Sequence, residues 1–378
     1  MKGVVVACAA ALLAAPAAAD GLLATPGYAP TDKDERGLWL QMEEQERELK
    51  RSNFVIRDPG LNAYVRKVFC RTVGEAECAP IRIYIMRTPY FNATMAPNGM
   101  MQVWSGLLLR TRDESQLAAV LGHEYVHYER RHSVQLFKAI KKNLALGAVL
   151  GGLVPGAGLL LVGSIFANSR EMERESDTGS VQLLAKAGYD PMASSRIWEQ
   201  IRLEMDATAV ARDKKSRKDK GGGMFATHPT TLDRMTDLKV LAGQQKVAGT
   251  PQHNRREYVT ALAPFWASIV DDQIKLNDFG ATEFLLGHLA SEGWTGDLLF
   301  ARGELYRSRG RPEDMTKAAE FYRQAVADPQ VPVEAWRGLG YALMRSGDTS
   351  GGQAALKEYL KHKPDAPDKA MIAMMAGA

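Results

Sequence analysis

The segment His123-Glu-Tyr-Val-His127 constrains this chain more than any other part of its sequence. It lies within residues 114–127, where the apolar residues Leu117, Val120 and Leu121 recur at the spacing of one helix face. Residues i and i+4 of a helix share a face, so the two histidines can bind a single zinc ion. The glutamate beside the first histidine can then act as a base toward water. The segment therefore predicts a buried helix in a metalloenzyme.

A catalytic zinc has three protein ligands, and the sequence offers three candidates for the third. His132 follows His127 by five residues without an intervening glycine to turn the chain, which favours a place on the helix surface or behind the ligands. His228 precedes a proline and could reach the metal, bind an oxyanion or cap local structure. Glu173 is the best candidate, because Asp177 shares its helix face and can orient a ligand histidine.

Several further segments occur in an order typical of one family. They are Phe91-Asn-Ala-Thr-Met-Ala-Pro-Asn-Gly99, Val103-Trp-Ser-Gly-Leu-Leu108, Ser169-Arg-Glu-Met-Glu-Arg-Glu-Ser-Asp177, Gly188-Tyr-Asp-Pro191 and His228-Pro229. With them, residues 34–241 resemble the HtpX-like zinc metallopeptidases, and most of all their periplasmic BepA-like branch. The resemblance implies one zinc ion on His123, His127 and Glu173, with Glu124 as the general base.

The same resemblance implies that residues 92–106 form an edge strand that holds the substrate backbone. An edge strand offers unpaired N–H and C=O groups, so an extended peptide can add to it irrespective of side chains. A purely structural strand would show the same alternation. The expected substrate-binding residues are Asn92, Ala93, Gly99, Met101 and Val103.

A basic stretch that ends in three glycines, residues 211–223, is typical of a flexible loop and leads directly to His228. The resemblance implies that His228 lies near the metal and can close over it. Two catalytic roles stay open: a fourth zinc ligand that keeps the resting enzyme latent, or a donor to the oxyanion.

Residues 1–19 are expected to be a cleavable signal peptide. Lys2 precedes an apolar run, and three alanines precede Asp20, as at a signal-peptide cleavage site. Lipidation at Cys8 and a retained membrane helix are the alternatives. The expected location is the periplasm, with association to a membrane as a further option.

Export would leave Cys70 and Cys78 as a closely spaced pair. Such a pair in an exported protein predicts a disulfide, between the end of a helix at 64–70 and the start of a strand at 81–86. Two free buried thiols are the alternative.

Residues 144–167 contain no charge and are long enough to span a bilayer, but Val154-Pro-Gly-Ala-Gly158 interrupts them. The interruption favours a helical hairpin between the two metal-binding helices, packed on the core or in peripheral contact with a membrane. A true membrane span is the alternative.

The expected fold is mainly α with a small β-sheet, an α+β zincin-type peptidase domain followed by an all-α helical-repeat domain. The expected bounds are 20–245 for the peptidase domain, 246–260 for a linker and 261–378 for tetratricopeptide-like repeats. Gly303 and Gly310 recur as Gly340 and Gly347, at an offset of 37 residues. Stacked helix pairs offer a concave surface to protein partners. A plain helical bundle is the alternative.

Together these features predict an exported zinc-dependent endopeptidase. The resemblance implies that it works in the bacterial periplasm, degrades misfolded or misassembled envelope proteins of the outer membrane and has a chaperone-like role in assembly. The alternative is a latent protease that acts mainly as a scaffold through its helical repeats. The expected partners are unfolded or misassembled proteins and an envelope protein complex. The net charge of +4 over 378 residues gives no indication of nucleic acid binding. The sequence does not name the clients, the cleavage specificity or the oligomeric state.

Overall fold

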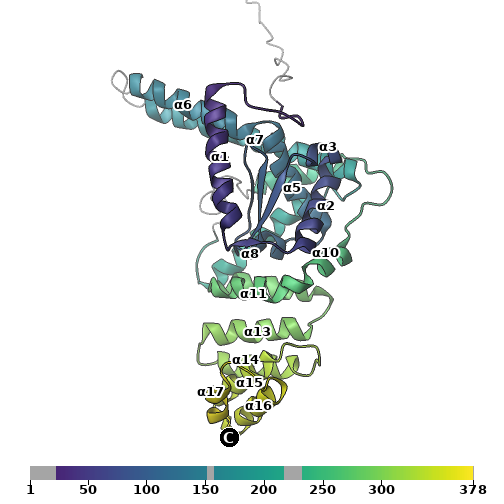
Figure 1. Ribbon diagram of the computed structural model, residues 1–378, viewed down its shortest axis with the longest axis vertical. Helices are drawn as coiled ribbons and strands as arrows, with labels where there is room; N and C mark the ends of the chain where they lie inside the picture. Colours follow the sequence, from purple (N-terminus) through teal and green to yellow (C-terminus); the bar gives the residue numbers. More distant parts are fainter. Residues whose placement is uncertain (1–22, 151–156, 217–231, 378) are drawn as a thin grey trace, which may run out of the picture.

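A computed structural model describes residues 23–150, 157–216 and 232–377, and for residues 143–150 and 157–168 it describes the backbone alone. The expected signal peptide and His228 lie outside these ranges. The molecule is elongated, with a mixed α/β part at one end and stacked helices that lead to the C-terminus at the other (Figure 1). This arrangement confirms the expected fold class.

The α/β part is built around a small sheet. Its strands are β1 (Val55–Ile56), β2 (Arg82–Met86), β3 (Ala93–Met95) and β4 (Met100–Trp104), in the spatial order β1-β2-β4-β3. β2 and β4 are parallel, whereas β1 and β3 run antiparallel to their neighbours. On one face, Arg82 and Tyr84 contact Glu46 of helix α1 (Lys33–Arg51), and on the other Ile85 belongs to the main core. The sheet therefore lies between α1 and the remaining helices.

The sheet order corrects the expected edge strand. β4, which contains Met101 and Val103, pairs with β2 on one side and β3 on the other, so its backbone groups are already used. Both side chains are fully buried, and Gly99 lies in the turn that leads into β4. The prediction that Gly99, Met101 and Val103 bind substrate backbone is therefore wrong. The outer strand on this side is β3, which begins at Ala93.

Helices surround this sheet. They are α1 (Lys33–Arg51), α2 (Pro59–Val73), α3 (Glu75–Cys78), α4 (Ser105–Arg110), α5 (Glu114–Glu129), α6 (His132–Leu150), α7 (Ala157–Ala187), α8 (Ala193–Ala211) and α9 (Leu232–Gly243). A disulfide joins Cys70 of α2 to Cys78 of α3. Since α2 continues to Val73 and Cys78 ends a separate short helix, the bond links two helices and not the expected helix and strand.

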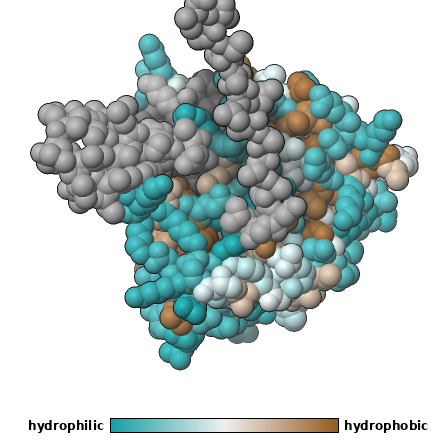
Figure 2. All heavy atoms as spheres, turned by 90° about the horizontal axis from the view of Figure 1, so that it is seen from above, coloured by the Kyte–Doolittle hydropathy of each residue, from teal (hydrophilic) through white to brown (hydrophobic). Residues whose placement is uncertain are grey.

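The apolar run at 144–167 is divided between α6 and α7, which contact each other and carry the segment away from the sheet (Figure 1). None of the helices in the described ranges combines the length and apolar character needed to cross a membrane. Hydrophilic side chains predominate among the described residues of the upper face, with smaller hydrophobic areas between them (Figure 2). Peripheral membrane contact stays a prediction.

The C-terminal part is entirely helical. Its helices are α10 (Arg255–Leu262), α11 (Trp266–Lys275), α12 (Phe279–Leu289), α13 (Gly296–Arg309), α14 (Asp314–Ala325), α15 (Glu334–Arg345), α16 (Thr349–His362) and α17 (Lys369–Met375). α13 packs on α14, and α15 packs on α16, with Gly310 and Gly347 in the left-handed region after the first helix of each pair. The 37-residue offset therefore corresponds to two helical hairpins.

The segment 246–260 is not the free linker that its polar composition suggests. Gln252 receives a hydrogen bond at its backbone oxygen from Ser115, at 2.5 Å, and donates its backbone N–H to Gly188, at 3.0 Å. Tyr258 of α10 is 2% exposed and belongs to the main core. Segment 246–260 therefore packs against the peptidase part before the C-terminal helices begin to stack.

Candidate metal centre

Helix α5 carries the His-Glu-x-x-His segment through the core. Asp113 caps its first turn by accepting the backbone N–H of Gln116 at 2.8 Å. Leu117 and Leu121 are fully buried, so apolar packing fixes the helix on the side away from the metal ligands. Helix α7 then crosses close to α5, because Gly179 has no side chain where Val126 approaches.

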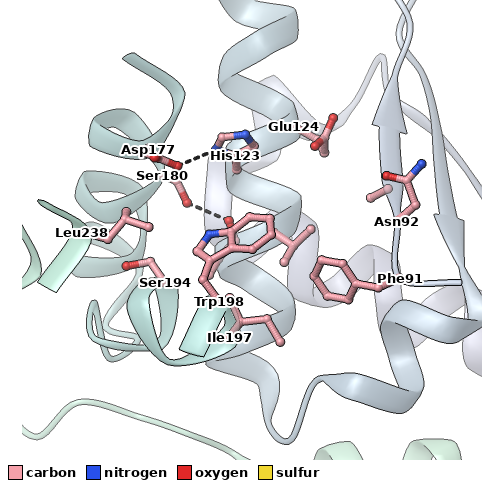
Figure 3. A pocket seen from close by; sticks show the side chains of 13 residues that line it. Phe91, Asn92, His123, Glu124, Asp177, Ser180, Ser194, Ile197, Trp198 and Leu238 are labelled. Atoms are coloured by element: carbon pink, nitrogen blue, oxygen red, sulfur yellow. Dashed lines mark hydrogen bonds and ion pairs between the residues drawn. The ribbon is translucent and has the colours of Figure 1, made fainter. Parts of the chain in front are cut away.

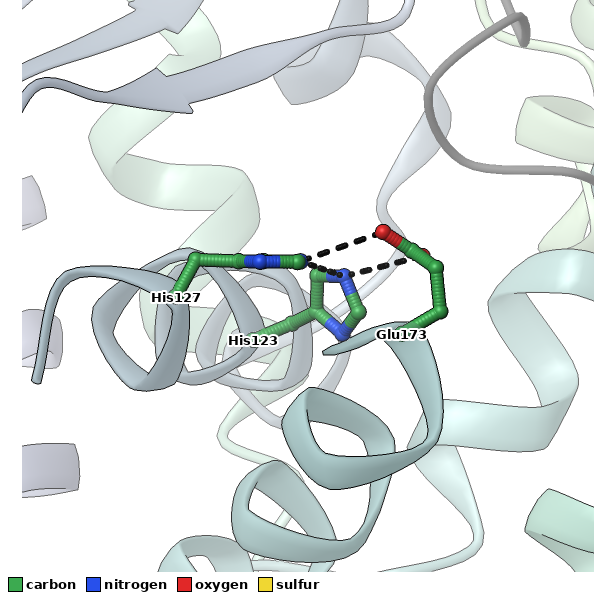
Figure 4. Close-up of side chains that lie close together, drawn as sticks. All are labelled: His123, His127 and Glu173. Carbon is green, nitrogen blue, oxygen red and sulfur yellow. Dashed lines mark hydrogen bonds and ion pairs between the residues drawn. The ribbon is translucent and has the colours of Figure 1, made fainter. Parts of the chain in front are cut away.

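This crossing brings three donor atoms together. The Nε2 atoms of His123 and His127 lie 3.1 Å apart, and the Glu173 carboxylate oxygens lie 3.2 Å from His127 Nε2 and 3.5 Å from His123 Nε2 (Figure 4). A tetrahedral zinc with ligands at about 2.0–2.2 Å separates its ligand atoms by roughly 3.3–3.6 Å. The spacing and the His-His-carboxylate chemistry therefore fit one zinc ion.

Asp177 lies one turn after Glu173 and accepts from the other nitrogen of His123, with Nδ1 and Oδ1 3.1 Å apart. This contact leaves Nε2 of His123 as the lone-pair nitrogen that faces the metal position. Arg234 of α9 in turn holds Asp177 with two hydrogen bonds of 2.7 Å and approaches Glu173 to 3.3 Å. The sequence did not indicate this role of Arg234, which lies six residues after His228.

The electrostatics of the cluster favour a positive charge at the donor atoms. Burial by itself lowers the pKa of His123, but the hydrogen bonds to Asp177 and Glu173 outweigh it and raise that pKa to about 9. Burial raises the pKa of Asp177, whereas the charge of Arg234 lowers it, and the net direction is down. The ionised carboxylates thus stabilise a cation beside His123, which a bound metal ion would supply.

Glu124 is buried, 6% exposed, and lies on the side of α5 that faces Asn92 (Figure 3). It lines a pocket with His123 on one side and apolar walls from Phe91, Ile197 and Trp198 on the other. Ala93, at the start of the outer strand β3, also lines this pocket. The candidate base, one histidine of the donor set and the start of the outer strand therefore meet in one cavity.

His132 is not on the helix surface, the first of the two places that the sequence suggested. It is 3% exposed, and its Nδ1 lies 2.9 Å from Nδ1 of His127, behind the donor atoms. Burial lowers the pKa of His132, which favours the neutral ring. Glu175 is exposed, and its carboxylate contacts the other nitrogen of His132.

Two histidines of an HExxH helix and a glutamate of a second helix define the metal-binding core of a zinc-type metallopeptidase. The comparison with known families agrees. Residues 56–242 match the model of peptidase family M48, which identifies this segment as a peptidase M48 domain.

The curated relatives support the same assignment. The beta-barrel assembly-enhancing protease of Escherichia coli is 26% identical over 217 residues, which cover 53% of this chain and 42% of the relative. A Vibrio cholerae protein whose name contains the same words is 29% identical over 215 residues, 52% of this chain and 42% of the relative. A mitochondrial metalloendopeptidase of Schizosaccharomyces pombe is 29% identical over 184 residues, 47% of this chain and 51% of the relative. The matches thus span about half of each protein or less.

Proposed function

We propose that this protein is a zinc-dependent endopeptidase. The observation that carries the proposal is that one nitrogen each of His123 and His127 and a carboxylate oxygen of Glu173 lie within 4.8 Å of one another, a donor set typical of a zinc site. The ion would leave one position open for water and substrate. When bound, zinc supplies a Lewis acid that makes water nucleophilic near neutral pH and polarises a carbonyl group.

The residues of the chain would transfer the protons and position the ligands. Glu124 accepts a proton from the attacking water at its carboxylate and later donates it to the leaving amine. Asp177 holds the His123 ring through Nδ1, and Arg234 holds Asp177. His228, which precedes α9 by four residues in the sequence, is proposed either to occupy the open metal position or to donate to the oxyanion.

The substrate is proposed to be an extended polypeptide that pairs with β3. Ala93 remains the proposed backbone contact, since it begins the outer strand β3 and lines the pocket that contains Glu124. Asn92 lines the same pocket, but its backbone oxygen already accepts the N–H of Trp104 at 3.1 Å, so it is proposed to contact the substrate through its side chain. Pairing through backbone groups accepts unfolded chains of varied sequence. The apolar wall formed by Phe91, Ile197 and Trp198 would favour an apolar side chain next to the scissile bond.

The finer proposal places this activity in the periplasm, on misassembled outer-membrane proteins. Its support is the expected signal peptide, the disulfide Cys70–Cys78 and the names of the bacterial relatives. Expression of the full chain in Escherichia coli, osmotic-shock fractionation and N-terminal mass measurement would test it. We expect periplasmic protein that begins at Asp20, and an uncleaved cytoplasmic product would contradict the proposal.

The peptidase proposal is tested with casein as an unfolded substrate. We expect cleavage by the purified protein, its loss after treatment with a zinc chelator, and its return when zinc is added back. His127→Ala should remove the activity and lower zinc content, whereas His362→Ala, a histidine 49% exposed on α16, should change neither. Cleavage that persists without metal would contradict the proposal.

A second candidate, a scaffold role of the helical part, is favoured by a groove of about 1040 Å³ between α10, α11, α13 and α15. Apolar residues such as Val259, Trp266 and Phe300 line it together with charged residues such as Arg337. A Glu124→Gln variant that still suppresses the aggregation of an unfolded envelope protein would support this role. Loss of that suppression with loss of cleavage would contradict it.

A further inference from the structure

The chain between α5 and α6 turns without a glycine. Arg131 adopts φ 56°, in the left-handed region that is unfavourable for a residue other than glycine. Its backbone N–H donates to Tyr128 at 2.9 Å, which ends α5, and His132 then begins α6. The turn folds the His132 ring back beneath the last metal-binding histidine of α5.

Side-chain contacts hold this turn in place. The Arg131 guanidinium pairs with Glu35 of α1, which is 1% exposed, and lies 4.6 Å from the centre of the Tyr28 ring. The Tyr28 hydroxyl donates to the same Glu35 carboxylate at 2.8 Å. A buried ion pair of this kind can offset the backbone strain at Arg131, so the N-terminal segment determines where His132 lies.

His132 links a carboxylate to a metal-binding histidine. Its Nε2 lies 3.0 Å from Glu175 Oε2, and its Nδ1 lies 2.9 Å from Nδ1 of His127. An ionised carboxylate only accepts hydrogen bonds, so Nε2 of His132 carries the hydrogen and Nδ1 carries the lone pair. Nδ1 of His127 must then be the donor. Ser176 Oγ, at 3.4 Å from the same His132 nitrogen, is the more distant neighbour.

The hydrogen on Nδ1 of His127 determines the state of its other nitrogen, which faces the metal position. A neutral imidazole has one N–H, and with that hydrogen on Nδ1 the lone pair is on Nε2. Nε2 is the atom 3.2 Å from Glu173 and 3.1 Å from the other ligand histidine. The opposite tautomer would place a hydrogen where a metal ion must bind.

We propose that His132 and Glu175 form a relay that selects the metal-binding tautomer of His127, so that His132 is a positioning residue for the zinc site. The proposal rests on the zinc-dependent function proposed above. It parallels the contact between Asp177 and His123, but it uses a histidine between the carboxylate and the ligand. Both ligand histidines are thereby oriented from their outer nitrogens.

The experiment measures zinc affinity by competition with a chelating dye, which does not depend on catalysis. His132→Leu keeps the volume but removes the acceptor, and we expect zinc binding about 10–100-fold weaker. His132→Asn places an amide oxygen near the position of Nδ1 and should restore affinity to within a few-fold of wild type. Glu175→Ala, at a residue 49% exposed, should weaken binding without unfolding the protein.

The matched control is Glu171→Ala on the same helix, because Glu171 is 66% exposed and pairs with Arg174. It should leave zinc affinity unchanged. Equal affinities for wild type, His132→Leu and Glu175→Ala would overturn the relay, as would equal losses for the Leu and Asn variants with folding intact by circular dichroism. A wild-type protein that binds no zinc would overturn both the relay and the proposed function. Failure of the relay alone would instead show as zinc binding that these substitutions leave unchanged.

Discussion

The close crossing of α5 and α7 predicts that one added methyl group disturbs the metal site. A Cβ at Gly179 would lie 2.7 and 3.1 Å from the two methyl carbons of Val126, whereas carbon atoms in ordinary contact are about 3.5–4.0 Å apart. In Gly179→Ala the helices must therefore separate locally by about 1 Å. Glu173 lies six residues before Gly179 on α7, so it would move away from the histidines of α5.

The expected losses of stability and of zinc affinity follow from this displacement. Overpacking a core contact lowers the free energy of unfolding by about 1–3 kcal/mol, whereas the higher helix propensity of alanine raises it by about 1 kcal/mol. The net loss of stability is therefore modest. Metal–ligand distances tolerate only about ±0.2 Å, so a displacement of about 1 Å exceeds what the donor set can absorb. We expect zinc affinity to fall at least about tenfold.

Zinc competition and thermal unfolding would be measured together. Gly122→Ala is the matched control, since its Cβ would lie 3.3 Å from Thr72 Cγ2 and 3.4 Å from Ser180 Oγ, contacts that small shifts relieve. The double variant Gly179→Ala with Val126→Ala removes the overlapping methyl groups and should recover most of the affinity. Wild-type affinity in Gly179→Ala, or no recovery in the double variant, would refute the reasoning.

Three further predictions concern other parts of the chain. Replacement of Cys70 and Cys78 by serine should lower the free energy of unfolding by about 2–3 kcal/mol, measured by urea titration without reductant, and an unchanged midpoint would count against it. Glu46→Gln should cost about 1–2 kcal/mol at neutral pH, because a hydrogen bond from Arg82 lowers the pKa of Glu46 from 4.5 to about 2. That stabilisation is present above pH 4.5 and disappears as the pH falls toward 2, so a pH-independent difference would be contradictory. His228→Ala should raise casein turnover if His228 occupies the metal position, or lower kcat by about 100-fold if it donates to the oxyanion, and an unchanged rate would reject both roles.

The donor set could be predicted because its members lie on helices. His123 and His127 are one turn apart on a single helix, and Glu173 precedes Asp177 by one turn on another. The i and i+4 spacing therefore indicates which side chains share a face, without knowledge of the tertiary structure. The strand expected at 81–86 likewise corresponds to β2.

The neighbours of the donor set depend on contacts that no local pattern contains. The position of His132 follows from a left-handed residue at Arg131, which is held by Glu35 some 96 residues earlier. A glycine at this position would have indicated the turn. An arginine does not, because its left-handed conformation can be predicted only if its contact with Glu35 is known. The role of Arg234 likewise follows from the packing of α9 against α7.

The prediction of the edge strand was wrong for a related reason. Alternation within 100–104 predicts a strand, but it does not say how many neighbours that strand has. β4 lies between β2 and β3, and only the tertiary pairing shows that β3 is the outer strand. Similarly, the polar composition of 246–260 did not reveal that Tyr258 is buried in the core.

The central claim is that Glu124 is the general base beside a zinc ion held by other residues. The most direct measurement is casein cleavage by the wild type and by Glu124→Gln, with zinc content determined on the same samples. We predict one zinc per chain in both proteins and cleavage at least about 100-fold slower in the variant. Cleavage by the variant at the wild-type rate, with zinc bound, would contradict the account.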